Sequence, residues 1–371
     1  MEKVSIGIAG LGFGREFIPI YQDHPNVDKV AINSRNPETL KRIGDAHGIP
    51  EELRFLDYND MIACTQLNAI HVVTPPATHA DYVLRALRAG KHTACTVPMG
   101  LTIEELKEIC KVKRETGLKY MMMETAVYTR EYLYAKNLVE TGQLGRIQFV
   151  RGSHMQDMGL DGWGEFWLGF PPMWYGTHAI GPLLDITNGT PEYVICHGSG
   201  RVKPELAARY NCPFAVETTT IKLRDNDVVA EATRSLYDTV RQYRESFDVY
   251  GTKMAFEWEQ LVDDGCAIHD GGEVAHRVVP PDVFDGIPES IRKYARPEEI
   301  ADPNQPSFIQ GSGHGGSHPH LVHEFVSALI EDREPAVDVL RSAYFTAAGI
   351  CSHTSAMQDG QRVYVPDFSK E

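Results

Sequence analysis

Cysteine is scarce in this chain, and its spacing excludes two classes of cross-linked protein. The cysteines number seven and none belongs to a C-x-x-C pair: Cys64, Cys95, Cys110, Cys196, Cys212, Cys266 and Cys351. A disulfide framework needs an even, regularly spaced set, and a zinc ribbon needs closely spaced pairs. We therefore expect small buried thiols in a cytoplasmic protein.

Long apolar segments and a surplus of basic residues are also missing. No run of residues approaches the length that spans a bilayer, and no basic leader precedes the first predicted strand. With 36 Lys and Arg against 51 Asp and Glu, the formal net charge is −15. Such a charge repels nucleic-acid phosphates and anionic membranes. We therefore expect neither as a partner, although local arginines could still hold a small anionic ligand.

Glycine is concentrated in a turn near the N-terminus. An apolar run leads into Gly10, Gly12 and Gly14, and a helical pattern follows. Glycines allow backbone N–H groups to approach a pyrophosphate, and a helix N-terminus favours its charge. The usual fingerprint has its third small residue at the position of Arg15, and here the extra glycine comes one residue earlier. A tight turn also requires glycine, but a turn that opens a βαβ pattern favours a dinucleotide site.

Strand and helix patterns alternate through residues 1–124. Strands are expected at residues 4–9, 29–33, 69–73, 92–95 and 120–123. Helices are expected at residues 15–22, 37–47, 77–89 and 103–116. This alternation predicts a doubly wound parallel sheet, in which ligands bind outside the carboxyl ends of the strands. We therefore expect one cofactor crevice, lined by Gly10, Gly12, Phe13, Gly14, Ser34, Arg35, Thr74, Pro75, Pro76, Thr96, Val97, Pro98 and Glu124.

The pattern changes after residue 124, which divides the chain into two expected domains, 1–124 and 125–371. A helix at 128–141 precedes strands expected at residues 147–153, 193–199, 215–223, 228–235 and 246–250. Most of these strands are joined by turns or loops, which predicts an open, mainly antiparallel sheet. Residues 263–313 are expected to form loops. A final helical pair, at 320–331 and 337–357, is expected to close the α/β fold, with the option of packing back on the first domain.

The end of the second predicted strand bears on cofactor choice. An NAD-specific site usually places Asp or Glu there to bind the ribose 2′-hydroxyl. This chain has Ser34 and Arg35 instead, a hydroxyl and a cation that suit the 2′-phosphate of NADP. In the alternative interpretation, Arg35 stacks on the adenine or faces solvent, so both NAD and NADP stay open.

Three further segments resemble the Gfo/Idh/MocA oxidoreductases in order and spacing: residues 73–79 (VTPPATH), residues 86–92 (ALRAGKH) and Val97-Pro98. The resemblance adds Arg15 and His79 to the expected cofactor-binding set. It implies a Rossmann domain, a C-terminal α/β domain with an open sheet, and nicotinamide-dependent dehydrogenation of carbinols in sugars and cyclitols. It also implies a homo-oligomer that associates through the open sheet.

One departure from the family narrows the resemblance. Most family dehydrogenases carry Glu-Lys-Pro at Thr96-Val97-Pro98, and their lysine helps to take the proton of the reacting hydroxyl, which Val97 cannot do. The NAD-dependent glycoside hydrolases, typified by α-N-acetylgalactosaminidases, have Val-Pro there, and their Tyr-x-Thr-His-x-x-Gly-Pro segment resembles residues 175–182. This resemblance implies three catalytic groups around the sugar, Tyr128, Tyr175 and His178.

The predicted chemistry is a redox-neutral cleavage of a sugar or glycoside. Oxidation at C3 acidifies the C2 proton, elimination releases the C1 substituent, water adds, and the hydride returns. A histidine suits the proton of the C3 hydroxyl, so His178 is favoured for it. Two other functions stay open: an ordinary NAD(P)-dependent sugar or cyclitol dehydrogenase, which Ser34 and Arg35 favour, and a non-catalytic dinucleotide sensor.

Other polar residues allow structural and functional interpretations. Asp185 lies two turns beyond His178 and is a candidate to orient its ring, although a solvated or capping role is favoured. Trp163, Trp174 and His314 are expected at the substrate, with core packing as the alternative for the tryptophans. The histidine-rich turn at His314, His318 and His320 lacks a recognisable metal-ligand pattern, so no metal is expected. Five arginines are candidates for an anion clamp or for ordinary ion pairs: Arg130, Arg151, Arg234, Arg241 and Arg244.

Overall fold

The computed structural model describes residues 3–160, 162–241, 243–261, 264–296 and 313–370. Its first sheet has six strands in the order β3-β2-β1-β4-β5-β6, and every neighbouring pair is parallel. The strands are β1 (Val4–Ala9), β2 (Val27–Asn33), β3 (Arg54–Phe55), β4 (Ala69–Val72), β5 (His92–Cys95) and β6 (Tyr120–Met122). The strand order reverses between β1 and β4, which is where such sheets open a binding crevice.

Helices on both faces bury this sheet, so all six residues of β1 are buried. They are α1 (Ile18–Asp23), α2 (Pro37–Ala46), α3 (Tyr58–Ala63), α4 (His79–Arg88) and α5 (Ile103–Thr116). The Asn36 side chain caps α2, and Thr102 caps α5 in a capping box with Glu105. The predicted helix at 15–22 is a 3-10 turn, η1 (Gly14–Glu16), followed by α1. The short β3 and α3 were not predicted, because two and six residues are too few to show a period.

The second sheet has nine strands in the order β14-β13-β12-β11-β7-β10-β9-β8-β15. Its strands are β7 (Ile147–Met155), β8 (Pro191–Ser199), β9 (Val216–Leu223), β10 (Val229–Ser235), β11 (Arg244–Gly251), β12 (Ala255–Glu257), β13 (Cys266–His269), β14 (His276–Val278) and β15 (Val363–Tyr364). Only β7 and β10 pair in parallel, whereas β9, β11 and the others pair antiparallel. The prediction of a parallel sheet followed by an open, mainly antiparallel one is confirmed.

The expectation of loops over residues 263–313 is wrong for part of that segment. Strands β13 and β14 form a hairpin there, and α9 (Glu289–Arg292) follows. These elements contain three or four residues each, so their polar composition masked them. Residues 297–312 of the predicted loop lie outside the described residues.

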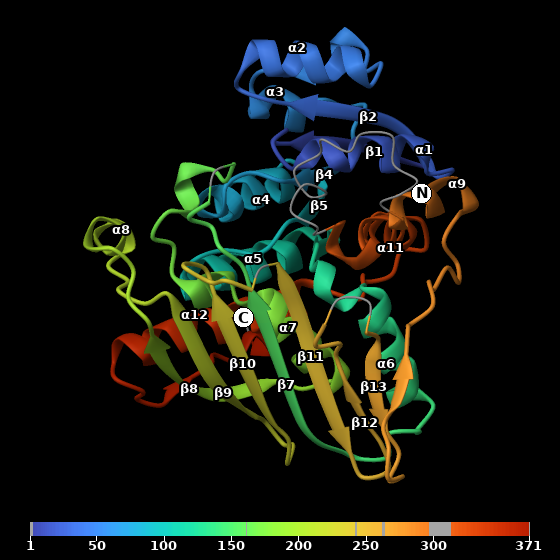
Figure 1. Ribbon diagram of the computed structural model, residues 1–371. Helices are drawn as coiled ribbons and strands as arrows, with labels where there is room; N and C mark the ends of the chain where they lie inside the picture. The colour runs from blue at the N-terminus through green and yellow to red at the C-terminus, as the bar shows by residue number, and fades with distance from the viewer. Residues whose placement is uncertain (1–2, 161, 242, 262–263, 297–312, 371) are drawn as a thin grey trace.

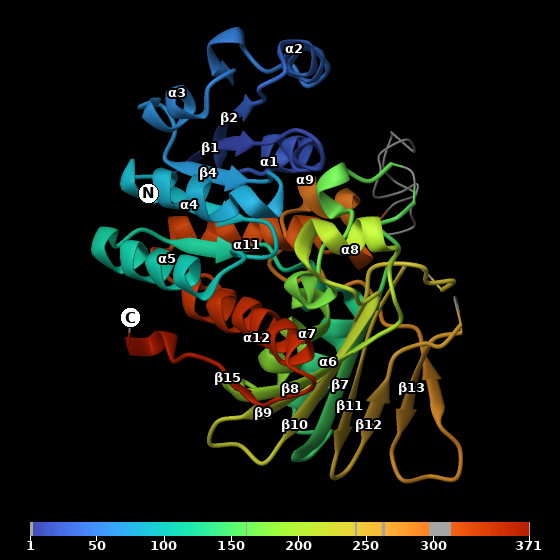
Figure 2. The ribbon, with the colours of Figure 1, turned by 90° about the vertical axis from the view of Figure 1, so that its left-hand side faces the viewer.

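Two helices cover one face of the second sheet, α7 (Thr177–Ile186) and α12 (Val339–Met357), and α6 (Arg130–Glu140) contacts α7. The short α8 (Pro204–Tyr210) lies between β8 and β9 in the chain. In Figure 2, α12 lies between this sheet and α5, and no helix of the described residues covers the opposite face of the sheet. None of the described helices is long and apolar enough to cross a membrane.

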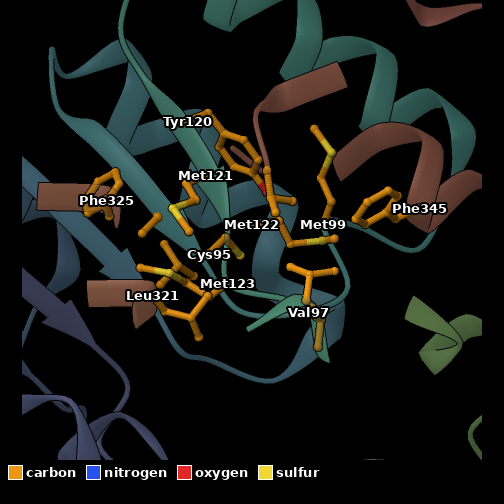
Figure 3. Packing of buried hydrophobic residues seen from close by; sticks show 14 of the residues in the cluster. Cys95, Val97, Met99, Tyr120, Met121, Met122, Met123, Leu321, Phe325 and Phe345 are labelled. Atoms are coloured by element: carbon orange, nitrogen blue, oxygen red, sulfur yellow. The ribbon is translucent and has the colours of Figure 1, made fainter. Parts of the chain in front are cut away.

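The last two helices join the two sheets. Helix α11 (His318–Ile330) contacts β1 and α1, while α12 contacts α5 and β6 as well as β8. Figure 3 shows side chains of β5, β6 and the loop after β5 packed with Leu321 and Phe325 of α11 and Phe345 of α12. Two hydrogen bonds cross the same joint, from Met99 N–H to Thr346 Oγ1 (3.2 Å) and from Met122 N–H to the Val337 carbonyl (3.2 Å). One buried apolar cluster therefore extends through both halves of the molecule.

Candidate functional site

The three glycines of the N-terminal turn are required for different reasons. Gly10 has φ +95°, and a Cβ there would lie 2.4 Å from the Val73 carbonyl oxygen. A Cβ on Gly14 would lie 3.0 Å from Ile8 Cγ2, so this glycine allows the 3-10 turn to approach β1. A Cβ on Gly12 would meet nothing within 4 Å, and the residue is exposed. The turn therefore leaves free space beside Gly12, as close approach of a pyrophosphate to the backbone requires.

His79 joins two of the strand ends that border this crevice. Its fully buried ring places one nitrogen 2.7 Å from the Thr74 carbonyl oxygen and the other 2.7 Å from that of Pro98. His79 therefore holds the loops after β4 and β5 together, and its ring nitrogens are engaged. The expected lining residues Thr74, Pro75, Pro76, Thr96 and Val97 belong to these two loops.

Ser34 and Arg35 follow β2 at the same edge of the sheet. Arg35 is exposed, and Ser34 Oγ accepts a hydrogen bond from Asn36 N–H (3.2 Å). Phe13 is partly exposed and packs edge-on against His318, with ring centroids 5.5 Å apart. Arg15 is half-buried in the same turn. The residues present thus fit a nicotinamide dinucleotide, with open backbone at Gly12 and a cation available at the end of β2.

His178 and Tyr175 lie together beside the end of β6. His178 is in the first turn of α7, and its Nδ1 lies 2.5 Å from Glu124 Oε1. Its Nε2 lies 3.3 Å from the Tyr175 hydroxyl, which the preceding 3-10 turn η6 (Pro172–Tyr175) supplies. Burial lowers the pKa of His178, but the charge and hydrogen bond of Glu124 outweigh it and raise the pKa overall. Glu124, predicted as a cofactor residue, therefore orients the histidine and stabilises its protonated form.

His154 is a site residue that the sequence analysis missed. Its ring centroid lies 4.9 Å from that of His178 and 4.9 Å from that of Tyr243. Among the described residues, no partner engages either ring nitrogen, although the side chain is fully buried. Burial and then the nearby Arg234 charge lower the pKa of His154 well below its usual range. It is therefore a neutral imidazole whose ring nitrogens have no hydrogen-bond partner among the described residues of the buried cluster.

A polar row across four adjacent strands places His154 in the site. Strand register aligns Glu217 of β9 with Arg234 of β10, Arg234 with His154 of β7, and His154 with Glu245 of β11. The Tyr243 hydroxyl donates to Glu245 (2.6 Å). Arg234 was expected to clamp an anion or form a sheet ion pair, but it is fully buried and bonds mainly to carbonyls. The signal in the sequence was Arg234, a charged residue at an inward-facing position of a predicted strand whose other inward-facing residues are small and apolar.

Tyr128 and Asp185 lie apart from this cluster. The Tyr128 ring packs near His320, with centroids 6.2 Å apart, and the residue lines a separate cleft with Lys136 and Asp185. The Asp185 carboxylate accepts hydrogen bonds from Tyr132 and Lys136, so it does not orient His178. The structure therefore brings together two of the three predicted catalytic residues, Tyr175 and His178.

The predicted substrate residues differ in position. His314 borders the cluster, with its ring centroid 6.1 Å from that of His178 and 6.0 Å from that of Tyr243. Trp174 packs against Phe170 and His353, with ring centroids 5.7 and 5.5 Å away. Trp163 packs at the edge of a second apolar cluster around Trp167. Of the three, His314 lies nearest to the histidine pair.

Two side-chain groups have ligand atoms close enough for a metal ion. His154, His178 and Glu245 each place one such atom within 4.8 Å of the others, as do Cys212, Glu217 and His353. In the first group Glu245 is bonded to Tyr243 and His178 to Glu124. Such a network of paired acids and bases suits proton transfer. The histidines of the histidine-rich turn do not form one cluster. His314 Nδ1 lies 3.2 Å from His318 Nε2, whereas His320 lies beside Tyr128.

Family models match both halves of the chain. Residues 4–124 match the model described as "Oxidoreductase family, NAD-binding Rossmann fold", which is named for Gfo/Idh/MocA. Residues 132–257 match the Gfo/Idh/MocA C-terminal domain. Together the two matches cover most of the chain.

Individual relatives extend the likeness over the full length. A glycosyl hydrolase family 109 protein of Porphyromonas gingivalis is 27% identical over 405 residues, covering 100% of this chain and 85% of the relative. Another, from Stenotrophomonas maltophilia, is 23% identical and covers 100% of this chain and 88% of the relative. A scyllo-inositol dehydrogenase from Lactobacillus casei, solved with NAD(H) and scyllo-inositol, superposes with a TM-score of 0.72 at 20% identity, covering 98% of this chain and 99% of that one.

Proposed function

The chain belongs to the Gfo/Idh/MocA oxidoreductase family, and from that premise we propose that it cleaves a glycoside by a redox-neutral, nicotinamide-dependent route. The observation that carries the proposal is the cluster of Glu124-backed His178, Tyr175 and neutral His154 in a family member that has Val97 in place of a lysine. A dehydrogenation needs one base for the hydroxyl proton. This cluster holds further acid and base groups, as elimination requires. The curated relatives named glycosyl hydrolase family 109 agree with this assignment.

His178 acts on the reacting hydroxyl, which we assign to C3 of the sugar. A bound nicotinamide supplies the chemistry of taking a hydride from this carbon and later returning it. His178 accepts the hydroxyl proton on Nε2, while its Nδ1–H donates to Glu124. The Glu124 carboxylate stabilises the imidazolium that forms, in the way an acidic partner supports a catalytic histidine.

His154 and Tyr175 act at C2 and C1. Oxidation at C3 acidifies the C2 proton, and neutral His154 accepts it on a free ring nitrogen. The C2–H electron pair forms the C1–C2 double bond as the C1–O bond breaks. Burial raises the pKa of Tyr175, so its hydroxyl is protonated and donates that proton to the leaving oxygen. Water then adds at C1 and gives a proton to the Tyr175 phenolate, while protonated His154 returns its proton to C2, so both groups are restored, and with return of the hydride no net oxidation occurs.

We infer that the cofactor is selected at the end of β2. Exposed Arg35 and the Ser34 hydroxyl suit the 2′-phosphate of NADP, whereas the glycosidase branch favours tightly held NAD. The identity and oxidation state of the nucleotide that co-purifies with the protein will decide between them.

We also infer a homo-oligomer that associates through the helix-free face of the second sheet (Figure 2). Multi-angle light scattering of the purified protein tests it. A monomer at micromolar concentration would contradict the inference.

The proposed activity is tested by incubating the purified protein with a panel of 4-nitrophenyl glycosides and with NAD or NADP. We expect nitrophenol release that requires the oxidised nucleotide, is abolished by borohydride and persists in a chelator. Stoichiometric accumulation of reduced nucleotide from a free sugar would instead indicate an ordinary dehydrogenase. Tight nucleotide binding without turnover would indicate a sensor.

A further inference from the structure

Arg234 is a fully buried cation on the inward face of β10. Its neighbours on this face are Ala230 and Ala232, which are also fully buried. Burying a guanidinium is costly unless its donors are satisfied and its charge is compensated. The position therefore indicates a specific role for the side chain.

Hydrogen bonds satisfy the Arg234 donors without an acidic partner. Nε donates to the Tyr175 carbonyl (2.9 Å), and Nη1 donates to the carbonyls of His154 (3.0 Å) and Ser235 (3.1 Å). Nη2 donates to Gln156 Oε1 (2.9 Å). These four acceptors are uncharged. Arg234 forms no direct ion pair with Glu217 or Glu245 in the part of the chain that the structure describes, although the Glu245 charge favours the cation from a distance.

The same guanidinium contacts both acid–base residues assigned to C2 and C1. It bonds the backbone of Tyr175 and of His154, and its central carbon lies 5.0 Å from the centroid of the Tyr175 ring. A planar five-donor fork fixes two backbone segments at once, which the point charge of a lysine does not.

We propose that Arg234 is a positioning residue that sets Tyr175 and His154 relative to each other, keeps His154 neutral, and stabilises the Tyr175 phenolate once its proton has left. This inference rests on the proposed function, because it takes Tyr175 and His154 as the acid–base pair. It assigns to Arg234 a role in proton transfer in place of contact with the substrate.

Titratable groups from five elements or loops face His154. They are Arg234 on β10, His178 on α7, Tyr175 on η6, Tyr243 and Glu245 at the start of β11, and His314 in the turn before α11. After burial, Arg234 is the largest contributor to the low pKa of His154, and it also lowers the pKa of Tyr175 against the effect of burial. Glu245 is the acidic group among those that face His154, and it is bonded to Tyr243.

The first test needs no substrate. Histidine ring NMR of the intact protein follows His154, assigned with His154→Gln. We expect His154 to stay neutral at pH values where an ordinary imidazole, with its pKa of about 6.5, is already protonated. In Arg234→Gln the His154 transition should move to higher pH, while Arg234→Lys, which keeps the charge, should leave it near its wild-type position.

Two results would overturn the inference: wild-type His154 that titrates like an ordinary imidazole, or Arg234→Gln with an unchanged His154 transition. The wild-type measurement stands even where a variant does not fold. Because no turnover is needed, an inactive wild-type protein would contradict the proposed function and leave this test intact.

Kinetics then separates positioning from charge. On a cleaved nitrophenyl glycoside, Arg234→Lys should lose about 10²-fold in kcat with little change in KM, because misplacement of a catalytic group by about 1 Å has an effect of that size. Its pH profile should keep its position, whereas both limbs of the Arg234→Gln profile should move to higher pH. Added guanidinium should partly restore Arg234→Ala. If Arg234→Gln loses kcat but neither limb of its pH–rate profile moves, the electrostatic roles proposed for Arg234 at His154 and Tyr175 are contradicted.

Discussion

At the scale of single residues, the chemistry of this site depends on what each histidine contacts. His79 has both ring nitrogens on carbonyls and acts as a structural tie. His178 has one nitrogen on a buried carboxylate and the other near a tyrosine hydroxyl. Among the described residues, no hydrogen-bond partner engages either ring nitrogen of His154, and the Arg234 guanidinium donates to its backbone carbonyl. Three buried imidazoles thus differ in role because their partners differ: the pKa of His178 is raised, whereas those of His79 and His154 are lowered.

Replacing His178 tests its assignment as the base for the hydroxyl proton. His178→Asn should lower kcat by about 10²–10⁴-fold, the usual range for loss of a positioned acid–base group. Nucleotide affinity should be unchanged, because the glycine turn is untouched. His276→Asn is the matched control, since His276 is exposed on β14. Equal activity of His178→Asn and the control on nitrophenyl glycosides would refute the assignment.

Glu124→Gln tests the ion pair through stability. Glu124 raises the pKa of His178 above its ordinary value of 6.5. The pair therefore stabilises the folded state fully below that ordinary value, and this contribution is lost as the pH rises through the folded pKa. Compared with wild type, Glu124→Gln should lose more free energy of unfolding at pH 5.5 than at pH 8.5. Urea unfolding at both pH values measures this difference, and an equal loss would rule out a charged pair.

At the scale of elements, the turn after β1 separates a structural glycine from a functional one. Gly10→Ala should cost about 1–3 kcal/mol, because its backbone has positive φ and the new Cβ meets the Val73 carbonyl. Gly12→Ala should change stability by less than about 0.5 kcal/mol, because its Cβ meets no protein atom. It should nonetheless weaken nucleotide binding at least tenfold. Thermal unfolding measures the stability of both variants, and calorimetric titration measures their nucleotide affinity. Undiminished binding in Gly12→Ala would show that the pyrophosphate binds elsewhere.

The turn η6, which presents Tyr175, is anchored from β9 and α12. Buried Glu217 accepts from Met173 N–H (2.7 Å), and its other oxygen lies 2.7 Å from His353 Nδ1. A Cβ on Gly349 of α12 would lie 2.2 Å from the Met173 carbonyl oxygen, so the helix packs directly on this turn.

A double-mutant cycle on Glu217→Gln and His353→Gln tests this anchor. Glu217→Gln should cost about 3 kcal/mol, because it breaks a buried pair. The two changes should show a coupling energy of about 0.5–3 kcal/mol. Glu38→Gln, on the exposed face of α2, is the control and should have little effect. Purely additive losses in urea unfolding would show that Glu217 and His353 act independently.

Features that depend on spacing within one segment could be predicted from the sequence, whereas features that depend on contacts between distant segments could not. The strands of the first sheet and the pairing of Tyr175 with His178 were predictable because each depends on spacing within one short segment. Arg234 and Glu245 reach His154 through strand register, over sequence separations of about 80 and 90 residues, and no local period encodes that register. Glu124 was predicted as a residue of the cofactor crevice, but its bond to His178 depends on how α7 packs on the turn η4 (Thr125–Val127), which follows Glu124.

At the scale of the whole molecule, the two sheets are joined by a common core. The apolar cluster includes β1, β5 and β6 of the first sheet, α11, which contacts β1, and α7 and α12 on the second sheet. Helices α11 and α12, from the end of the chain, insert at this joint, so the cofactor half and the site half are packed as one body (Figures 1 and 3). Surface ion pairs such as Lys113–Glu334 (2.7 Å) also cross the joint, but exposed pairs contribute little.

This shared core predicts that nucleotide binding in the first half stabilises the second. All four tryptophans, Trp163, Trp167, Trp174 and Trp258, lie after residue 124, whereas the glycine turn that would hold the nucleotide is in the first sheet. A nucleotide at one hundred times its dissociation constant adds about 2.7 kcal/mol to the free energy of unfolding. Tryptophan fluorescence should therefore report one thermal transition that rises with nucleotide concentration and coincides with the transition in far-UV circular dichroism. Gly12→Ala, with its weakened binding, should lose most of this rise at the same nucleotide concentration. A tryptophan transition that stays fixed while the circular dichroism splits in two would show that the halves unfold separately.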